Sequence, residues 1–283
     1  MIEPKSTVPN MRPAPKDKHP LVLALCQVSF TPVMKMEDYI PSLQDVLRKS
    51  GFPKYSKHVV SSFNFEMKPG VMDKPTQKDE IIWEFVNSDD SRSVVVTQSS
   101  IAVIILRREY SNSENFLESV LHGYGNLHDL AKPLHVTRIG LRYVDLVEPQ
   151  AGLPRLDDCL MGNLYDDSFL ADEAHSGHSH LQKRMRMKNG SLLTLNLRAT
   201  DAPNAKVRVL SPDFQLFSLR PNFKLEAEGP HAVIDIDNSF TFTEPNENVL
   251  LDNVIAHFRA LHRHHKEAFR SATTEELRNA YDM

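Results

Sequence analysis

The sequence predicts an α+β protein built from two pseudo-repeats, each in the order strand, helix, four strands, helix (β-α-β4-α). Residues 19–23 (HPLVL) and 132–136 (KPLHV) both place Pro-Leu at the start of a strand-forming run. Each half also ends in a helix with the same apolar spacing. The matched positions are Phe116, Leu117, Val120, Leu121, Tyr124, Leu127 and His128 in the first half, and Leu250, Leu251, Val254, Ile255, Phe258, Leu261 and His262 in the second.

We therefore expect a single domain over residues 19–272, made of pseudo-repeats 19–131 and 132–272. Residues 1–18, which are rich in proline and mixed charges, are expected to form a disordered arm, and residues 273–283 a C-terminal tail.

In the first half, apolar runs rich in Val and Ile predict strands at 21–31, 59–67, 81–86, 93–97 and 101–106. Apolar residues at helical spacing, followed by Gly51, predict a helix over 37–50. Ser111 with Glu114 three residues later is the pattern of a capping box, which predicts a helix from there to about Ala131.

In the second half, similar patterns predict strands at 136–147, 181–187, 192–197, 214–225 and 232–240. Asn189-Gly190 indicates a tight hairpin between the second and third of them. A short helical segment is expected between Leu156 and Leu164, and the last long helix from near Pro245 to about Arg270.

Composition bounds the class of protein. The chain has 283 residues, of which 41% are hydrophobic and 25% are charged, as in an ordinary globular protein. Its net charge of −4 argues against a dedicated nucleic-acid binder but leaves room for a local basic patch. Its two cysteines, Cys26 and Cys159, form no disulfide framework. The first residues lack the apolar core of a signal peptide, and no apolar run suits a membrane span, so we expect a cytosolic protein without a membrane partner.

The order of the predicted elements resembles that of the TATA-binding-protein-like fold. This resemblance implies that the two pseudo-repeats pair edge to edge in one curved antiparallel sheet, with the helices on one face. The other face would then be the natural binding surface.

The predicted strand at 138–145 (RIGLRYVD), together with Pro-Leu-Val at 20–22, carries a second resemblance. It resembles the central Arg-x-Gly-Leu-Arg-Tyr-x-Asn strand and the opening of a sporadically distributed family of uncharacterised bacterial proteins. The resemblance covers nearly the whole chain after residue 18 and departs from the family pattern at Asp145, where the family usually has Asn. It implies a cytosolic bacterial protein and supplies no catalytic residue.

Arg138, Gly140 and Arg142 share one face of this strand, because side chains alternate along a strand. Two arginines that flank a glycine suit contact with an anion or a phosphate, and Arg107 could extend the same patch. The alternative is that the arginines form structural salt bridges with carboxylates of a neighbouring strand. Arg138, Arg142 and Arg107 are the predicted ligand-binding residues.

Three groups of residues are weaker candidates for metal sites. The first group, His175, His178 and His180, falls in a polar loop; the second, His257, His262, His264 and His265, falls on the last helix; the third is Asp145, Asp235 and Asp237. The helix lacks the His-Glu-x-x-His pattern, and we interpret its histidines as a solvated basic end. The three aspartates would support metal-dependent catalysis only if they converge.

Phosphate loops, Gly-x-Ser-x-Gly, Gly-x-Gly-x-x-Gly and Cys-x-x-Cys are all missing from the sequence. The sequence therefore predicts no catalytic residue, cofactor or metal, and favours a non-catalytic binding or interaction module that uses the free face of its sheet. A protein or peptide is the expected partner, and nucleic acid is a further candidate. The alternatives are a metal-dependent phosphodiesterase or nuclease and, from the sporadic distribution of the similar family alone, a partner or immunity component of a mobile defence system. The oligomeric state stays open.

Overall fold

The computed structural model describes residues 20–64, 67–68, 71–72, 76–106, 109–132, 135–149, 155–161, 177–210, 226–246 and 251–281. The strands of the main sheet are β1 (Leu21–Phe30), β2 (Lys54–Asn64), β5 (Thr76–Val86), β6 (Arg92–Val96), β7 (Ser100–Leu106), β8 (Val136–Val147), β9 (His178–Arg186), β10 (Leu192–Thr200) and β13 (His231–Asn246). The helices are α1 (Met36–Lys49), α2 (Ser113–Leu130), α4 (Leu251–Ala272) and α5 (Glu275–Ala280), with a 3₁₀ turn at Leu156–Asp158.

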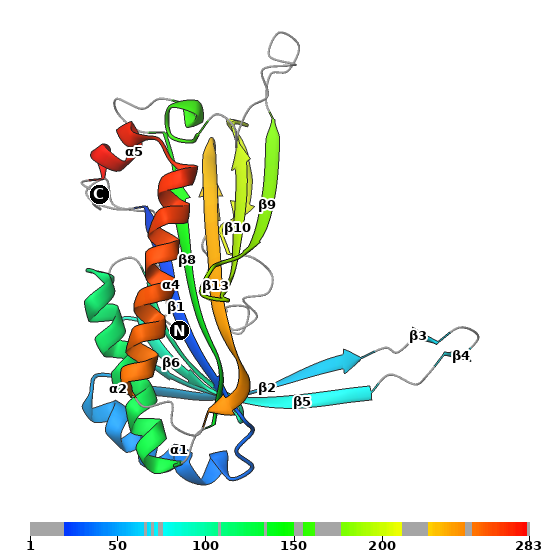
Figure 1. Ribbon diagram of the computed structural model, residues 1–283, viewed down its shortest axis with the longest axis vertical. Coiled ribbons are helices and arrows are strands. Elements are labelled where there is room, and N and C mark those ends of the chain that lie inside the picture. The colour runs from blue at the N-terminus through cyan, green and yellow to red at the C-terminus, as the bar shows by residue number, and fades with distance from the viewer. Residues whose placement is uncertain are drawn as a thin grey trace, which may run out of the picture.

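The nine strands form one antiparallel sheet in the order β2-β5-β6-β7-β1-β8-β13-β10-β9 (Figure 1). In the first half of the chain the first strand, β1, pairs with the last, β7. In the second half the first strand, β8, likewise pairs with the last, β13. The halves join because β1 pairs with β8 at the centre of the sheet. Two repeats that pair edge to edge would have this arrangement, and the duplication itself stays a prediction.

The prediction of an α+β fold with a large antiparallel sheet is confirmed. The helices lie on one face of the sheet, where α1, α2 and α4 bury their apolar sides against alternate residues of the strands (Figure 1). The first six residues of the central strand β1, Leu21–Cys26, form a continuous apolar run, because Ala24 and Cys26 pack in the core beneath the helices whereas Val22 and Leu23 pack on the other face. The edge strand β9 is mostly exposed.

The face opposite the helices is not wholly free, which corrects part of the predicted binding surface. Two short strands, β11 (Lys206–Arg208) and β12 (Glu226–Glu228), form a separate two-stranded sheet. Val209 and Ala227 from this region share an apolar cluster with Leu23, Val144 and Val233 of the main sheet. Part of the second face is therefore a second core rather than a surface.

Other predicted elements differ in detail. The predicted strand at 214–225 lies outside the described residues, as do the arm at 1–18 and the last three residues, 162–164, of the predicted helical segment. Between β2 and β5 the chain forms a further short pair of strands, β3 (Met67–Lys68) and β4 (Val71–Met72). The predicted C-terminal tail contains α5, whose Leu277 is fully buried.

Helix α2 begins one residue later than its capping box predicts. The N-cap is Asn112, whose side chain accepts a hydrogen bond from the backbone N–H of Asn115 at 2.9 Å. The predicted cap, Ser111, instead accepts a hydrogen bond from the side chain of Asn115. Asparagine and serine cap helices about equally well, so the sequence alone does not choose between neighbours.

This difference gives a direct test. We expect Asn112→Ala to lower the free energy of unfolding by about 1 kcal/mol, because a backbone N–H of the first turn loses its acceptor. The matched variant Ser111→Ala should lower the free energy of unfolding by only a few tenths of that amount. Urea denaturation of both variants measures the difference, and an equal or larger loss for Ser111→Ala would move the cap back to the position predicted from the sequence.

Candidate functional site

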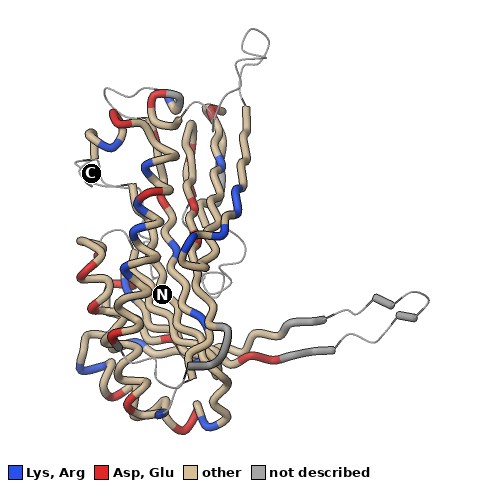
Figure 2. The backbone as a smooth tube through the Cα atoms, viewed as in Figure 1, with Lys and Arg blue, Asp and Glu red and all other residues tan. Residues whose placement is uncertain are grey.

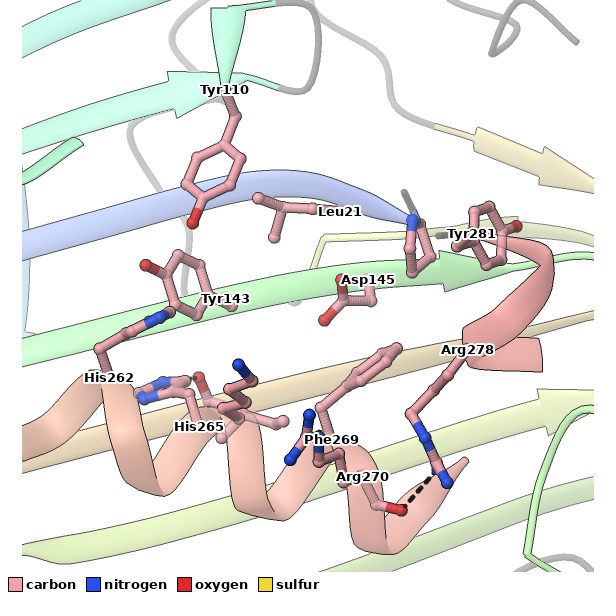
Figure 3. Close-up of a pocket in the computed structure, with 13 residues that line it drawn as sticks. Leu21, Tyr110, Tyr143, Asp145, His262, His265, Phe269, Arg270, Arg278 and Tyr281 are labelled. Carbon is pink, nitrogen blue, oxygen red and sulfur yellow. Dashed lines mark hydrogen bonds between the residues drawn. The ribbon is translucent and has the colours of Figure 1, made fainter. Parts of the chain in front are cut away.

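A cavity of about 550 Å³ opens on the helix face of the sheet, where α4 and α5 pass over the start of β1 and the end of β8 (Figure 3). Its lining residues are Pro20, Leu21, Tyr110, Tyr143, Asp145, Ile236, His262, His265, Lys266, Phe269, Arg270, Arg278 and Tyr281. The volume lies within the range of small-molecule sites, roughly 300–1,000 Å³.

Three cations stand on the helical side of the cavity. Lys266 and Arg270 are one helical turn apart on α4, so they lie on the same face of that helix. Arg278 comes from α5 and donates a hydrogen bond to the backbone carbonyl of Arg270 in the last turn of α4 (Figure 3). It also donates a hydrogen bond to the backbone carbonyl of Thr273, just after α4. These bonds fix the guanidinium at the rim of the cavity.

None of these three cations forms an ion pair with another described residue. Lys266 and Arg270 are exposed, whereas Arg278 is half-buried. The helical side of the cavity therefore carries an excess of positive charge, which favours an anionic occupant.

The sheet side of the cavity carries Tyr143 and Asp145, which alternate on β8 and point to the same face. Burial, together with the neighbouring Tyr110 hydroxyl, raises the pKa of Tyr143 well above its usual value. Burial likewise raises the pKa of Tyr110. Both phenols are consequently neutral at physiological pH. The rings of Tyr110 and Tyr143 pack edge to face, with their centroids 5.9 Å apart, so the floor of the cavity is aromatic.

Two histidines complete the wall between the helix and the sheet. His265 is buried, and its two ring nitrogens lie 2.9 Å from the carbonyl oxygens of Leu261 and Ile236. Burial lowers the pKa of His265 to about 4. Burial also lowers the pKa of His262, and its Nδ1 atom has no hydrogen-bond partner among the described residues. Both rings are therefore neutral at pH 7 and add no charge to the cavity.

The arginines predicted to bind a ligand occupy the opposite face of the sheet. Arg142 makes a bidentate pair with Asp235, with Nε to Oδ1 at 2.7 Å and a terminal nitrogen to Oδ2 at 2.6 Å. Asp235 is only 3% exposed. This is the salt bridge between neighbouring strands that the sequence left as the alternative.

Arg138 folds back along the same strand. Its guanidinium donates a hydrogen bond to the side-chain carbonyl of Gln27 at 3.1 Å and covers Gly140. A Cβ atom at position 140 would lie 2.8 Å from that guanidinium, so the glycine makes room for the arginine rather than for a ligand. The third predicted residue, Arg107, lies outside the described residues.

The three candidate carboxylates do not converge. Asp145 faces the cavity beneath the helices, whereas Asp235 lies beside Val144 on the other face of the sheet. Asp237 alternates with Asp235 and shares its face. The condition set by the sequence for a metal-dependent nuclease is therefore not met by these residues.

The histidines of α4 correct a second interpretation, because they are not a solvated helix end. His264 and His265 are buried, and His257 packs against Phe240 with ring centroids 4.3 Å apart. His178 and His180 are exposed at the start of β9, and His175 lies outside the described residues. Within the part of the chain that the structure describes, no three His, Cys, Asp or Glu side chains are placed to hold a metal ion.

Sequence reasoning missed the cavity because its residues are dispersed. Lys266 and Arg270 look like ordinary solvated positions of an amphipathic helix, and Arg278 falls in a segment predicted to be a tail. The pairing of helix and sheet that brings them towards Tyr143 is a tertiary feature. The one available signal was the one-turn spacing of Lys266 and Arg270.

Comparisons with known proteins assign no family to the chain. No protein-family model matches the chain, and no curated protein matches it. Of the helices that the structure describes, none combines the length and the apolar character needed to cross a membrane.

Proposed function

We propose that this protein is a non-catalytic binding protein whose ligand is a small molecule with an anionic group, held in the cavity between α4, α5 and β8. The observation that supports this most directly is the gathering of Lys266, Arg270 and Arg278 around one cavity without an ion-pair partner among the described residues. Cations at such a site bind phosphate or carboxylate groups through charge-assisted hydrogen bonds.

The remainder of the cavity suits a planar or apolar group attached to that anion. Tyr110, Tyr143 and Phe269 supply aromatic surface, and aromatic rings stack on other rings at low entropic cost. The ligand class that combines both features is an aromatic molecule bearing a phosphate or a carboxylate. This proposal places the ligand in the cavity rather than against Arg138 and Arg142 of β8, because Arg142 already forms an ion pair with Asp235.

A set of three probes tests the proposal. Phenyl phosphate carries both features, inorganic phosphate carries the anion alone, and phenol carries the ring alone. We expect phenyl phosphate to bind more tightly than either of the others in isothermal titration calorimetry. The double variant Lys266→Gln/Arg270→Gln should weaken its binding about tenfold or more, because hydrogen bonds to charged groups contribute about 1.5–3 kcal/mol.

Arg263→Gln is the matched control, since Arg263 is an exposed cation of the same helix that does not line the cavity. Its affinity for phenyl phosphate should equal that of the native protein. Equal losses in the control and the double variant, or no preference for phenyl phosphate over phenol, would contradict the proposal.

A further inference from the structure

Positive charge is concentrated in one segment of this acidic chain. Residues 177–210 contain seven cations, Lys183, Arg184, Arg186, Lys188, Arg198, Lys206 and Arg208, against a single carboxylate, Asp201. The carboxylate of Asp201 accepts a hydrogen bond from the backbone N–H of Gly177. The rest of the chain is correspondingly more acidic than the net charge of −4 suggests. A local field of this kind survives an overall negative charge, because salt screens distant charges within about 10 Å.

Four of these cations lie on β9 and on the turn that follows it, at the edge of the main sheet (Figure 2). Arg184 and Arg186 pair with Thr194 and Leu192 of β10 and share the face of the sheet opposite the helices. Lys183 pairs with Leu195 and points to the helix face. Lys188 lies in the tight turn. We call Lys183, Arg184, Arg186 and Lys188 the β9 basic edge, and all four side chains are exposed.

The β9 basic edge has no counter-charge nearby in the described chain. None of its four members forms an ion pair with a described carboxylate. The neighbouring strand presents the neutral Thr194 and Asn196 beside Arg184, and Asp235 and Asp237 lie one strand further away, on β13. In addition, β9 is the terminal strand of the sheet, so the N–H groups of its outer side do not pair with another described strand.

We propose that the β9 basic edge binds the phosphate backbone of nucleic acid without sequence preference. Lysine and arginine neutralise phosphates and release counterions, and arginine also matches the phosphate group with two parallel hydrogen bonds. The strand His178–Arg186 contains no Phe, Tyr or Trp, the large aromatic side chains that stack most strongly on bases. Contacts from this edge therefore read the backbone, which all sequences share.

The salt dependence of binding to a short DNA duplex of mixed sequence tests this inference. Fluorescence anisotropy should show binding that weakens steeply between about 50 mM and 200 mM salt. The quadruple variant Lys183→Gln/Arg184→Gln/Arg186→Gln/Lys188→Gln should bind about tenfold or more weakly at about 100 mM salt. Its slope of log affinity against log salt should be smaller in magnitude by about 3 to 4, since each phosphate contact contributes about 0.9.

The control variant carries the same change of charge at a distant place. Lys35, Arg48, Lys49 and Lys132 are exposed around α1 and after α2, and their replacement by Gln should leave duplex binding and its slope almost unchanged. The cavity variant Lys266→Gln/Arg270→Gln should also retain duplex binding, so failure here is separable from failure of the cavity proposal. Circular dichroism confirms that each variant is folded.

Any one of three results would overturn the inference. The first is that the native protein does not bind the duplex at about 50 mM salt, where backbone contacts are strong. Alternatively, the quadruple variant and the control would lose affinity equally. Finally, a poly-glutamate peptide of equal charge would compete as well as the duplex does, which would assign the edge to an acidic polypeptide.

Discussion

Replacement of Asp235 by Ala is expected to lower the free energy of unfolding by about 3–5 kcal/mol, the cost of leaving a buried charge without its partner. Asp235 is 3% exposed, and the side chain of Arg142 keeps 14% of its accessible surface. The bidentate geometry means that two charge-assisted hydrogen bonds are lost together. Urea denaturation of the native protein and the variant measures this loss.

Two further variants separate the cost of an unpaired buried charge from the cost of lost packing. In Arg142→Met/Asp235→Leu both charges are replaced by apolar groups, and most of the stability should return, because such replacements are often neutral. Glu114→Ala removes one partner of an exposed pair with Arg259 and should have little effect on stability, because solvent screens exposed ion pairs. If Asp235→Ala costs no more than Glu114→Ala, the central salt bridge is not a structural element.

Acidification is expected to destabilise the fold through His265. The pKa of His265 falls from its ordinary value of 6.5 to about 4 on folding, because burial disfavours the charged ring. Between these two values the unfolded chain binds the proton more tightly, so stability is lost as the pH falls from about 6.5 towards 4. At about 1.36 kcal/mol per pH unit the loss attributable to this residue is roughly 3 kcal/mol.

The variant His265→Gln isolates that contribution. Glutamine keeps a donor for the carbonyl of Leu261 or Ile236 but does not titrate, so the variant should be less stable than the native protein at neutral pH and lose less on acidification. His178→Gln, which changes an exposed histidine, is the matched control. Thermal unfolding followed by circular dichroism at a series of pH values measures both. Parallel curves for the native protein and His265→Gln would show that His265 does not set the acid limit.

The sequence predicted the elements of this fold better than its site, and the reason is physical. Runs such as 21–26 and 93–97 are rich in apolar residues because both faces of these strands are largely buried, and this property is visible in the sequence itself. Helix α1 matches its predicted span within a residue at each end, because its apolar spacing and Gly51 are local signals. The short strands β11 and β12 lacked such a signal, because each is only three residues long.

The site depended on information that no local pattern contains. Arg142 and Asp235 were each noticed, but their pairing depends on the register between β8 and β13. The histidines of α4 were interpreted as solvated because histidine is a polar residue, whereas His264 and His265 lie on the side of α4 that contacts the sheet. Lys266 and Arg278, which lie on different helices, line the same cavity only because α5 turns back after Thr273.

The position of β1 between β7 and β8 also sets the order in which the chain can fold. Val28 must find Ile101 on one side and Ile139 on the other, so both ladders of β1 join segments that are far apart in the chain. Contacts between distant segments require the closure of long loops and slow folding. While the chain is being synthesised, β1 has no partner on either side until β7 has been made. The apolar run of β1 is therefore exposed throughout that time, and the expected period of aggregation lies between the synthesis of β1 and the arrival of β7.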